Sequence, residues 1–395
     1  MSNRRPGWML SFAALLAAGW LAPARAGDEP TTVYTGTLGK QAIVMELPSP
    51  HSGILFDARY FYTRHRIDIG IGGPVAADGH LTLEEDGTSN DFELARQPDG
   101  GWKGTWKNPQ GQSLPVLLHP AVLPPLPAGA SDFLKQARAN KPYVYLRLRT
   151  MALVRDKRQS FMGHRLQWWR EPGSGIRLFQ IEDGYPASQR QRINQALMSE
   201  LWGNVDEYYG CVNGNGLGDG GYTLSVKPTF LGASAISLVE SFDIYCGGAH
   251  PNSGRSAINL DAHTGEKLWL GDILWTGKKR PFHYPPIPGE PDNSPTRQNM
   301  LDRWADYRDR VFVPWLVRQL KKRYPKQMAS GKDQCGYADD PDIWMYADWY
   351  LAPKGVFFIP YFPHVVESCA ETDYWSLLPY SELGKHTGRL RLDLP

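Results

Sequence analysis

The sequence has few of the features that mark the common enzyme and nucleic-acid-binding classes. It has only four cysteines in 395 residues, without a Cys-x-x-Cys spacing, and it has no Gly-x-Ser-x-Gly elbow, no His-Glu-x-x-His helix and no Cys/His zinc spacing. Charged residues make up 21% of the chain and form no obvious basic run, so the long-range attraction that drives nucleic-acid binding is missing. The sequence therefore predicts no metal ion, no cofactor, no nucleic-acid partner and no catalytic residue.

Residues 1–26 have the pattern of a secretory signal peptide. Arg4 and Arg5 form a positive start, Met9 to Leu21 an apolar stretch, and Ala24 to Ala26 a small-x-small cleavage site. Its removal changes the formal net charge from +2 to −1, because 43 basic residues become 40 against 41 acidic ones. No later apolar segment approaches the roughly 20 residues that span a bilayer. We therefore expect a periplasmic or secreted protein without a transmembrane helix, and we predict no particular oligomeric state.

Residues 27–119 are rich in short segments in which apolar and polar residues alternate. Ile67, Ile69 and Ile71, for example, are separated by single polar or small residues, a pattern that places one face of a strand in a core and the other in water. About eight such segments follow one another at a spacing of roughly ten residues, which favours an antiparallel meander closed into a small barrel or folded into a sandwich. The predicted strands are 33–38, 41–47, 54–62, 66–71, 80–85, 91–96, 101–107 and 113–118.

A proline-rich linker at 120–131 precedes a predicted second domain at 132–395. Its pattern is that of an α+β domain with antiparallel hairpins and two main helices, at about 189–207 and 297–323. The fold class expected for the whole chain is therefore α+β, with an all-β N-terminal part. The strands predicted in the second domain are 142–154, 164–170, 176–181, 222–229, 233–246, 256–260, 343–351 and 355–362.

All four cysteines, Cys211, Cys246, Cys335 and Cys369, lie in the second half of the chain. In an exported protein they favour two disulfides rather than a metal site or a reactive thiol. Of the three possible pairings, the geometry of the predicted hairpins favours the local one. Cys246 falls opposite about residue 216, close to Cys211, and Cys369 falls opposite about residue 339, close to Cys335. Each bridge would then close the base of one hairpin.

The segment Ser241–Gly254 contains the motif Tyr-x-Gly-Gly-Ala-His-Pro, and Asn259–Asp272 follows it closely. Together with Gly355–Tyr361 and Leu378–Leu383, it resembles a bacterial extracytoplasmic domain of the RsiV type over about residues 135–385. That family includes the lysozyme-receptor domain of an anti-sigma factor and a domain that accompanies a peptidoglycan deacetylase. The resemblance implies a binding domain whose partner is a lysozyme-like protein or peptidoglycan. The receptor's signalling role is not implied, because no cytoplasmic sigma-binding segment is expected.

Candidate binding residues lie in two places. Tyr245, His250 and Asn252 belong to the motif, where two glycines and a proline shape the exit of a strand. One interpretation is that His250 is presented at the rim of a binding site. The other interpretation, which is favoured, is that its side chain bonds a nearby carbonyl group and locks the turn. The second place is the proline-rich loop at 281–295, whose aromatic side chains suit a partner surface as well as a plain connection. These side chains are Phe282, His283 and Tyr284.

These observations lead to one functional hypothesis and two alternatives. We expect a non-enzymatic binding protein that recognises or inhibits a lysozyme-like cell-wall hydrolase, including an immunity role. The alternatives are an enzyme that acts on peptidoglycan and an accessory protein that only binds cell-wall glycan. A glycosidase needs two carboxyl groups that face one cleft. Acidic neighbours in the sequence do not show that arrangement, and a pair assembled from distant segments stays open.

Overall fold

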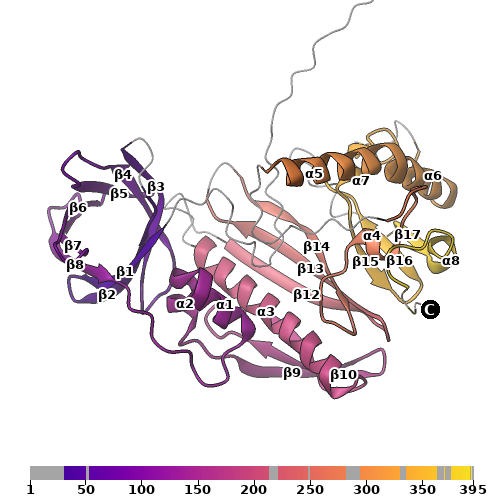
Figure 1. Ribbon diagram of the computed structural model, residues 1–395, viewed down its shortest axis with the longest axis horizontal. Helices are drawn as coiled ribbons and strands as arrows, with labels where there is room; N and C mark the ends of the chain where they lie inside the picture. Colours follow the sequence, from indigo (N-terminus) through magenta and orange to yellow (C-terminus); the bar gives the residue numbers. More distant parts are fainter. Residues whose placement is uncertain are drawn as a thin grey trace, which may run out of the picture.

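The computed structural model describes residues 31–49, 53–212, 221–247, 250–281, 294–329, 335–362, 369, 375–391 and 393. Its N-terminal part is a closed antiparallel barrel of eight strands, in which β1 pairs with both β2 and β8 (Figure 1). The sequence pattern left a barrel and a sandwich open, and the barrel is correct. The strands are β1 Thr32–Leu38, β2 Gln41–Leu47, β3 Ile54–Tyr62, β4 Ile69–Pro74, β5 Leu81–Glu85, β6 Asp91–Arg96, β7 Trp102–Lys107 and β8 Ser113–Pro120.

The barrel encloses a hydrophobic core in which Leu83 and Phe92 are fully buried. The carboxylate of Glu85 is also buried, and it accepts hydrogen bonds from the Tyr60 hydroxyl at 2.5 Å and the Trp106 indole N–H at 2.7 Å. These donors offset the cost of removing a carboxylate from water. The barrel is therefore a packed unit with its own core, and the outer face of β1 to β3 packs against Tyr143 of the following segment.

Two helices that the sequence did not predict join the barrel to the following sheets. The strand expected at 142–154 is wrong: residues 142–148 are helical, and the strand begins only at Val154. Pro142 occupies the first helical turn, where its fixed φ suits a helix. Tyr143 packs edge-on against Phe61 of β3, with ring centres 4.9 Å apart. This contact with the barrel favours the helix, whereas the sequence pattern alone had indicated a strand. The helices are α1 Asp132–Asn140 and α2 Pro142–Leu148.

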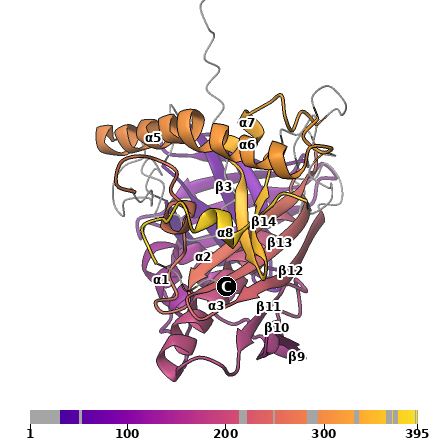
Figure 2. The ribbon, with the colours of Figure 1, turned by 90° about the vertical axis from the view of Figure 1, so that its right-hand side faces the viewer.

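The middle of the molecule is layered around the long helix α3 (Figures 1 and 2). Sheets β11-β10-β9 and β12-β13-β14 share one core with α3, in which Ile193, Leu197 and Leu201 of the helix are fully buried. The helix predicted at 189–207 and the long hairpin after it are confirmed. The elements are β9 Val154–Phe161, β10 His164–Arg170, β11 Arg177–Ile181, α3 Ala187–Cys211, β12 Gly221–Leu231, β13 Ala235–Tyr245 and β14 Asn252–Asp261.

The C-terminal part adds a third sheet, β15-β16-β17, which lies beside β14. The Asn259 side chain of β14 donates to the Trp349 carbonyl of β15 at 2.7 Å. The helix predicted at 297–323 is confirmed, with a π-helical turn at Arg308–Phe312 between α5 and α6. The elements are α4 Leu270–Ile273, α5 Pro295–Tyr307, α6 Val313–Arg323, α7 Asp342–Met345, β15 Asp348–Ala352, β16 Gly355–Ile359, β17 Leu377–Pro379 and α8 Tyr380–Leu383.

The strand expected at 343–351 begins later than predicted, because its first residues form the short helix α7. The Asp340 carboxylate accepts the Asp342 N–H at 3.0 Å and so helps to start that helix. The remainder of the hairpin, β15 with β16, is confirmed. The α+β class predicted from the sequence is therefore correct for the whole chain.

Both predicted disulfides are confirmed. The Cα atoms of Cys211 and Cys246 lie 4.3 Å apart, and those of Cys335 and Cys369 lie 5.5 Å apart. Two disulfides fit an oxidising, extracytoplasmic compartment. The expected signal peptide, residues 1–26, lies outside the described residues. In the described ranges, every helix is too short or too polar to cross a membrane.

Candidate ligand site at the barrel junction

The structure places the motif residues at one end of the sheet β12-β13-β14. Tyr245 ends β13 opposite Gly221, and Asn252 begins β14 opposite Ile244. The disulfide of Cys246 ties this end to the C-terminus of α3. The side chain of Asn252 is exposed and that of Tyr245 is half-buried. The two residues therefore share one braced sheet end.

His250 lies between these strands and is exposed. Its Nδ1 atom is 3.0 Å from the Pro251 carbonyl, which is a contact of the turn-locking kind. The other three candidates, Phe282, His283 and Tyr284, lie outside the described residues.

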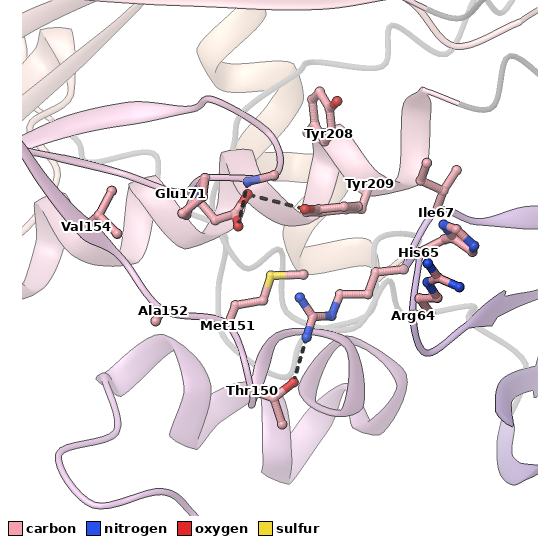
Figure 3. Close-up of a pocket in the computed structure, with 13 residues that line it drawn as sticks. Arg64, His65, Ile67, Thr150, Met151, Ala152, Val154, Glu171, Tyr208 and Tyr209 are labelled. Carbon is pink, nitrogen blue, oxygen red and sulfur yellow. Dashed lines mark hydrogen bonds between the residues drawn. The ribbon is translucent and has the colours of Figure 1, made fainter.

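A cavity of about 540 Å³ lies where the barrel meets the central layers (Figure 3). Small-molecule sites commonly have volumes of roughly 300 to 1,000 Å³. Its walls come from the β3–β4 connection, the segment after α2, the β10–β11 turn and the end of α3, so no short sequence motif contains it. The residues of the sheet end, Tyr245, His250 and Asn252, are not among its walls. The lining residues are Arg64, His65, Arg66, Ile67, Thr150, Met151, Ala152, Val154, Glu171, Pro172, Gly173, Tyr208 and Tyr209.

The β3–β4 connection brings three consecutive basic residues, 64–66, to one side of this junction cavity (Figure 3). Arg66 has a left-handed backbone, with φ of 66°, which costs energy in a non-glycine residue. Its guanidinium donates to the Thr150 hydroxyl at 2.9 Å. Close by, the Asp68 N–H donates to the Tyr209 carbonyl at 2.9 Å. The basic connection is therefore held to both α3 and the segment after α2.

The β10–β11 turn forms another side of the junction cavity. The carboxylate of Glu171, a residue only 4% exposed, accepts the Gly173 N–H at 3.0 Å and the Tyr209 hydroxyl at 3.3 Å (Figure 3). It also accepts the Ser174 N–H at 2.6 Å. Burial and the neighbouring Glu171 charge raise the pKa of Tyr209 to about 12, so this hydroxyl keeps its proton at neutral pH and donates it. The charge of Glu171 is thus already stabilised by its own turn and by Tyr209.

The basic side is different, because the side chains of Arg64 and His65 are exposed and have no hydrogen-bond or ion-pair partner in the described part of the chain. Unpaired cationic and donor groups beside a cavity favour an anionic ligand. The rings of Tyr208 and Tyr209 add apolar surface for the body of such a ligand. In contrast, the described ranges hold no cluster of three or more His, Cys, Asp or Glu side chains that could bind a metal ion.

A buried ion network behind the basic connection joins the barrel to α2 and α3. The Asp68 carboxylate accepts from the Arg147 guanidinium, from the Tyr143 hydroxyl at 2.6 Å and from Arg59 at 3.1 Å. Arg147, which is 1% exposed, also pairs with Asp206 at 2.9 Å. Charges buried in this way are held in one geometry by their partners. The junction cavity is therefore preformed.

A pair of acids from distant segments does exist, but it lies elsewhere. Glu200 of α3 and Glu240 of β13 are 3% and 6% exposed. The Asn204 amide donates to Glu240 at 2.7 Å, and burial raises the pKa of both carboxyl groups, that of Glu240 to about 7. Neither residue lines the junction cavity. Because both are enclosed between α3 and the sheet, they do not face a cleft that a polymer could enter.

Among the lining residues, the triplet Arg64-His65-Arg66 is the one short feature that the sequence contains, and it is not among the predicted binding residues. A short basic run in a strand connection is more often a solvated turn than a binding element, so the sequence alone gives little indication of a site there. Comparison with known proteins adds no identification: no protein-family model matches the chain, and no curated protein matches it. The resemblance to the RsiV-type domain stays a prediction.

Proposed function

We propose that this chain is an exported, non-enzymatic binding protein whose junction cavity holds the acidic group of a cell-wall fragment, such as a carboxylate of a peptidoglycan stem peptide. The observation that carries the proposal is the unpaired guanidinium of Arg64, with the unpaired imidazole of His65, beside a preformed cavity whose own carboxylate, Glu171, is already satisfied. A guanidinium binds a carboxylate through two parallel N–H donors.

The size and chemistry of the junction cavity support a fragment rather than a long polymer. A volume of about 540 Å³ encloses a molecule of a few linked residues. The two tyrosines supply ring surface, and Thr150 supplies a hydroxyl that Arg66 already orients. A cell-wall origin of the ligand is supported by the resemblance to the RsiV-type domain and by the extracytoplasmic location that the disulfides fit.

Calorimetric titration of the mature chain with a soluble muropeptide tests this function. We expect binding that weakens by about tenfold or more in Arg64→Ala, because a charge-assisted pair is lost. Lys40→Ala is the matched control, since Lys40 is another exposed cation in a barrel turn, and its affinity should equal that of the parent. A muropeptide whose carboxylates are amidated should bind weakly. Absence of heat at millimolar ligand, or equal affinities for both variants, would contradict the proposal.

Recognition of a lysozyme-like hydrolase is a second candidate. It is favoured by the braced sheet end, where the disulfide of Cys211 and Cys246 holds the strands that carry Tyr245 and Asn252. A rigid surface loses little entropy on binding a protein. Pull-down and activity assays with purified lysozymes test this candidate, and Asn252→Arg should abolish any inhibition if that end makes the contact. Analysis of the muropeptides by mass spectrometry after incubation tests the enzymatic alternative, which a new product would favour.

A further inference from the structure

A cluster of basic side chains lies at the C-terminal end of α6, on the outside of the molecule and far from the barrel (Figures 1 and 2). Each of these side chains is exposed, and none has a hydrogen-bond or ion-pair partner in the part of the chain that the structure describes. Between Asp309 and Asp333 the sequence contains no acidic residue. Only three of the basic residues are consecutive, fewer than the about five or six that mark a charged block in a sequence. These residues, the α6 cluster, are Arg318, Lys321, Lys322, Arg323 and Lys326.

The amphipathic pattern of α6 brings three of these cations to one face. Leu316 and Leu320 are fully buried in the C-terminal core. Arg318 stands three and four residues before Lys321 and Lys322, a spacing that places the three side chains next to one another on the opposite, solvent-facing side of the helix. Like charges at this spacing repel one another and destabilise the helix. An anionic partner would remove that repulsion.

The helix dipole accounts for only part of the α6 cluster. Cations in the last turn of a helix are favourable, and Lys321, Lys322 and Arg323 lie in the last turn of α6. The effect falls off within one turn, so it does not account for Arg318, which precedes that turn, or for Lys326, which follows the end of the helix. Among the described residues, the fold therefore provides no stabilising contact for these two cations.

The positive field of the α6 cluster reaches the neighbouring helix α8. The Lys385 ammonium donates to the Glu382 carboxylate at 3.0 Å. This hydrogen bond holds the pKa of Glu382 below its ordinary value, and the charges of Lys322 and Arg323 act in the same direction. Because Glu382 is already compensated by Lys385, it does not neutralise the cluster.

We infer that the α6 cluster binds the anionic phospholipid headgroups of a membrane surface. Groups of roughly four to eight Lys and Arg side chains on an amphipathic helix are typical of binding to anionic lipids. The cluster is spread along the outside of a helix and lines no part of the junction cavity, so it suits a flat surface with many phosphates better than a single small anion. A lysine ammonium binds phosphate as a point charge, without a fixed geometry. This inference does not rest on the function proposed for the junction cavity.

Co-sedimentation of the mature full-length chain with vesicles tests this inference. We expect the parent protein to sediment with vesicles of equal parts phosphatidylglycerol and phosphatidylcholine, to stay in solution with phosphatidylcholine alone, and to be released as the sodium chloride concentration rises. The triple variant Arg318→Gln, Lys321→Gln, Lys322→Gln should bind about a hundredfold more weakly, because each cation beside an anionic membrane contributes about fivefold. All three side chains are exposed, so the variant should keep the parent's melting temperature.

Two controls separate the α6 cluster from the total charge and from the junction cavity. The triple variant Lys40→Gln, Lys103→Gln, Lys227→Gln removes the same positive charge from exposed positions in the barrel and on β12, and it should sediment as the parent does. Arg64→Ala should also leave sedimentation unchanged.

The inference is overturned if the parent protein stays in solution with the anionic vesicles, or if both triple variants sediment to the same extent. It is also overturned if the parent protein binds soluble polyphosphate but not the vesicles, since that result would assign the α6 cluster to a soluble anionic polymer.

Discussion

The guanidinium of Arg147 in α2 binds the carboxylate of Asp68 in the barrel, and the two side chains are only 1% and 8% exposed. This ion pair joins two parts of the chain that are 79 residues apart in sequence. Removing one partner of a buried pair leaves an uncompensated charge, which costs about 3 to 5 kcal/mol. We therefore expect Asp68→Ala to lower the free energy of unfolding by about that amount in urea denaturation.

A surface pair within the barrel gives the matched control. Lys107 and Glu93 lie 3.1 Å apart, with side chains 49% and 53% exposed. Because water screens such a pair, Lys107→Ala should cost less than about 1 kcal/mol. Equal losses for the two variants would mean that the buried network does not hold the junction.

The stability of the fold should depend on pH through the acids between α3 and β13. Burial raises the pKa of Glu240 from 4.5 to about 7, and that of Glu200 in the same direction. The folded protein therefore binds these protons more tightly than the unfolded chain does. Their contribution is fully present below about pH 4.5 and is lost as the pH rises towards 7.

For Glu240 this loss corresponds to about 3 kcal/mol. Urea denaturation at a series of pH values measures it, and Glu240→Gln, which cannot ionise and can still accept from Asn204, should reduce the decrease. An unchanged pH dependence in Glu240→Gln would show that Glu240 ionises normally.

The disulfides should contribute substantially to stability. The bridge between Cys211 and Cys246 closes a sequence separation of 35 residues, for which the chain-entropy relation gives about 4 kcal/mol. The double variant Cys211→Ser, Cys246→Ser should therefore melt well below the parent. Alkylation under denaturing conditions followed by mass measurement should detect no free thiol in the exported protein, and four alkylated cysteines would contradict both bridges.

The closure of the barrel depends on a glycine. A Cβ atom at Gly36 of β1 would lie 1.9 Å from the Leu117 carbonyl oxygen of β8. Gly36→Ala should therefore separate the two closing strands and destabilise the protein by about 2 kcal/mol or more. The clash is with the backbone of β8, which can shift only by disturbing the hydrogen bonds between the strands. At Gly221 a Cβ atom would meet nothing within 4 Å, so Gly221→Ala should melt as the parent does. Similar melting temperatures for both variants would show that β1 and β8 can separate without cost.

The sequence predicted the parts of the fold in which local pattern and burial agree. Alternation marked the barrel strands, and the cysteine positions gave both disulfides because each bridge closes a local hairpin. The segment 142–148 was misread as a strand because its helix depends on Tyr143 packing against Phe61, a contact with a distant strand. Such tertiary contacts override local preference.

The junction cavity could not be predicted for a related reason. Its walls come from segments around residues 66, 151, 171 and 209, and no one of these segments contains a binding motif by itself. The sequence directed attention to the motif around His250 because that motif is compact. The structure instead brings scattered residues together beside the Arg147 network, and the basic residues at 64–66 are the one short feature of the sequence among them.

A photoreactive muropeptide gives the most direct measurement of the central claim, that the junction cavity is where the ligand binds. After irradiation and digestion of the full chain, we predict that the label lies in peptides containing Arg64 to Ile67, Met151 or Tyr209. Competition with unmodified muropeptide should remove it. Label confined to the sheet end around Tyr245 and Asn252, with the cavity peptides unlabelled, would contradict the account.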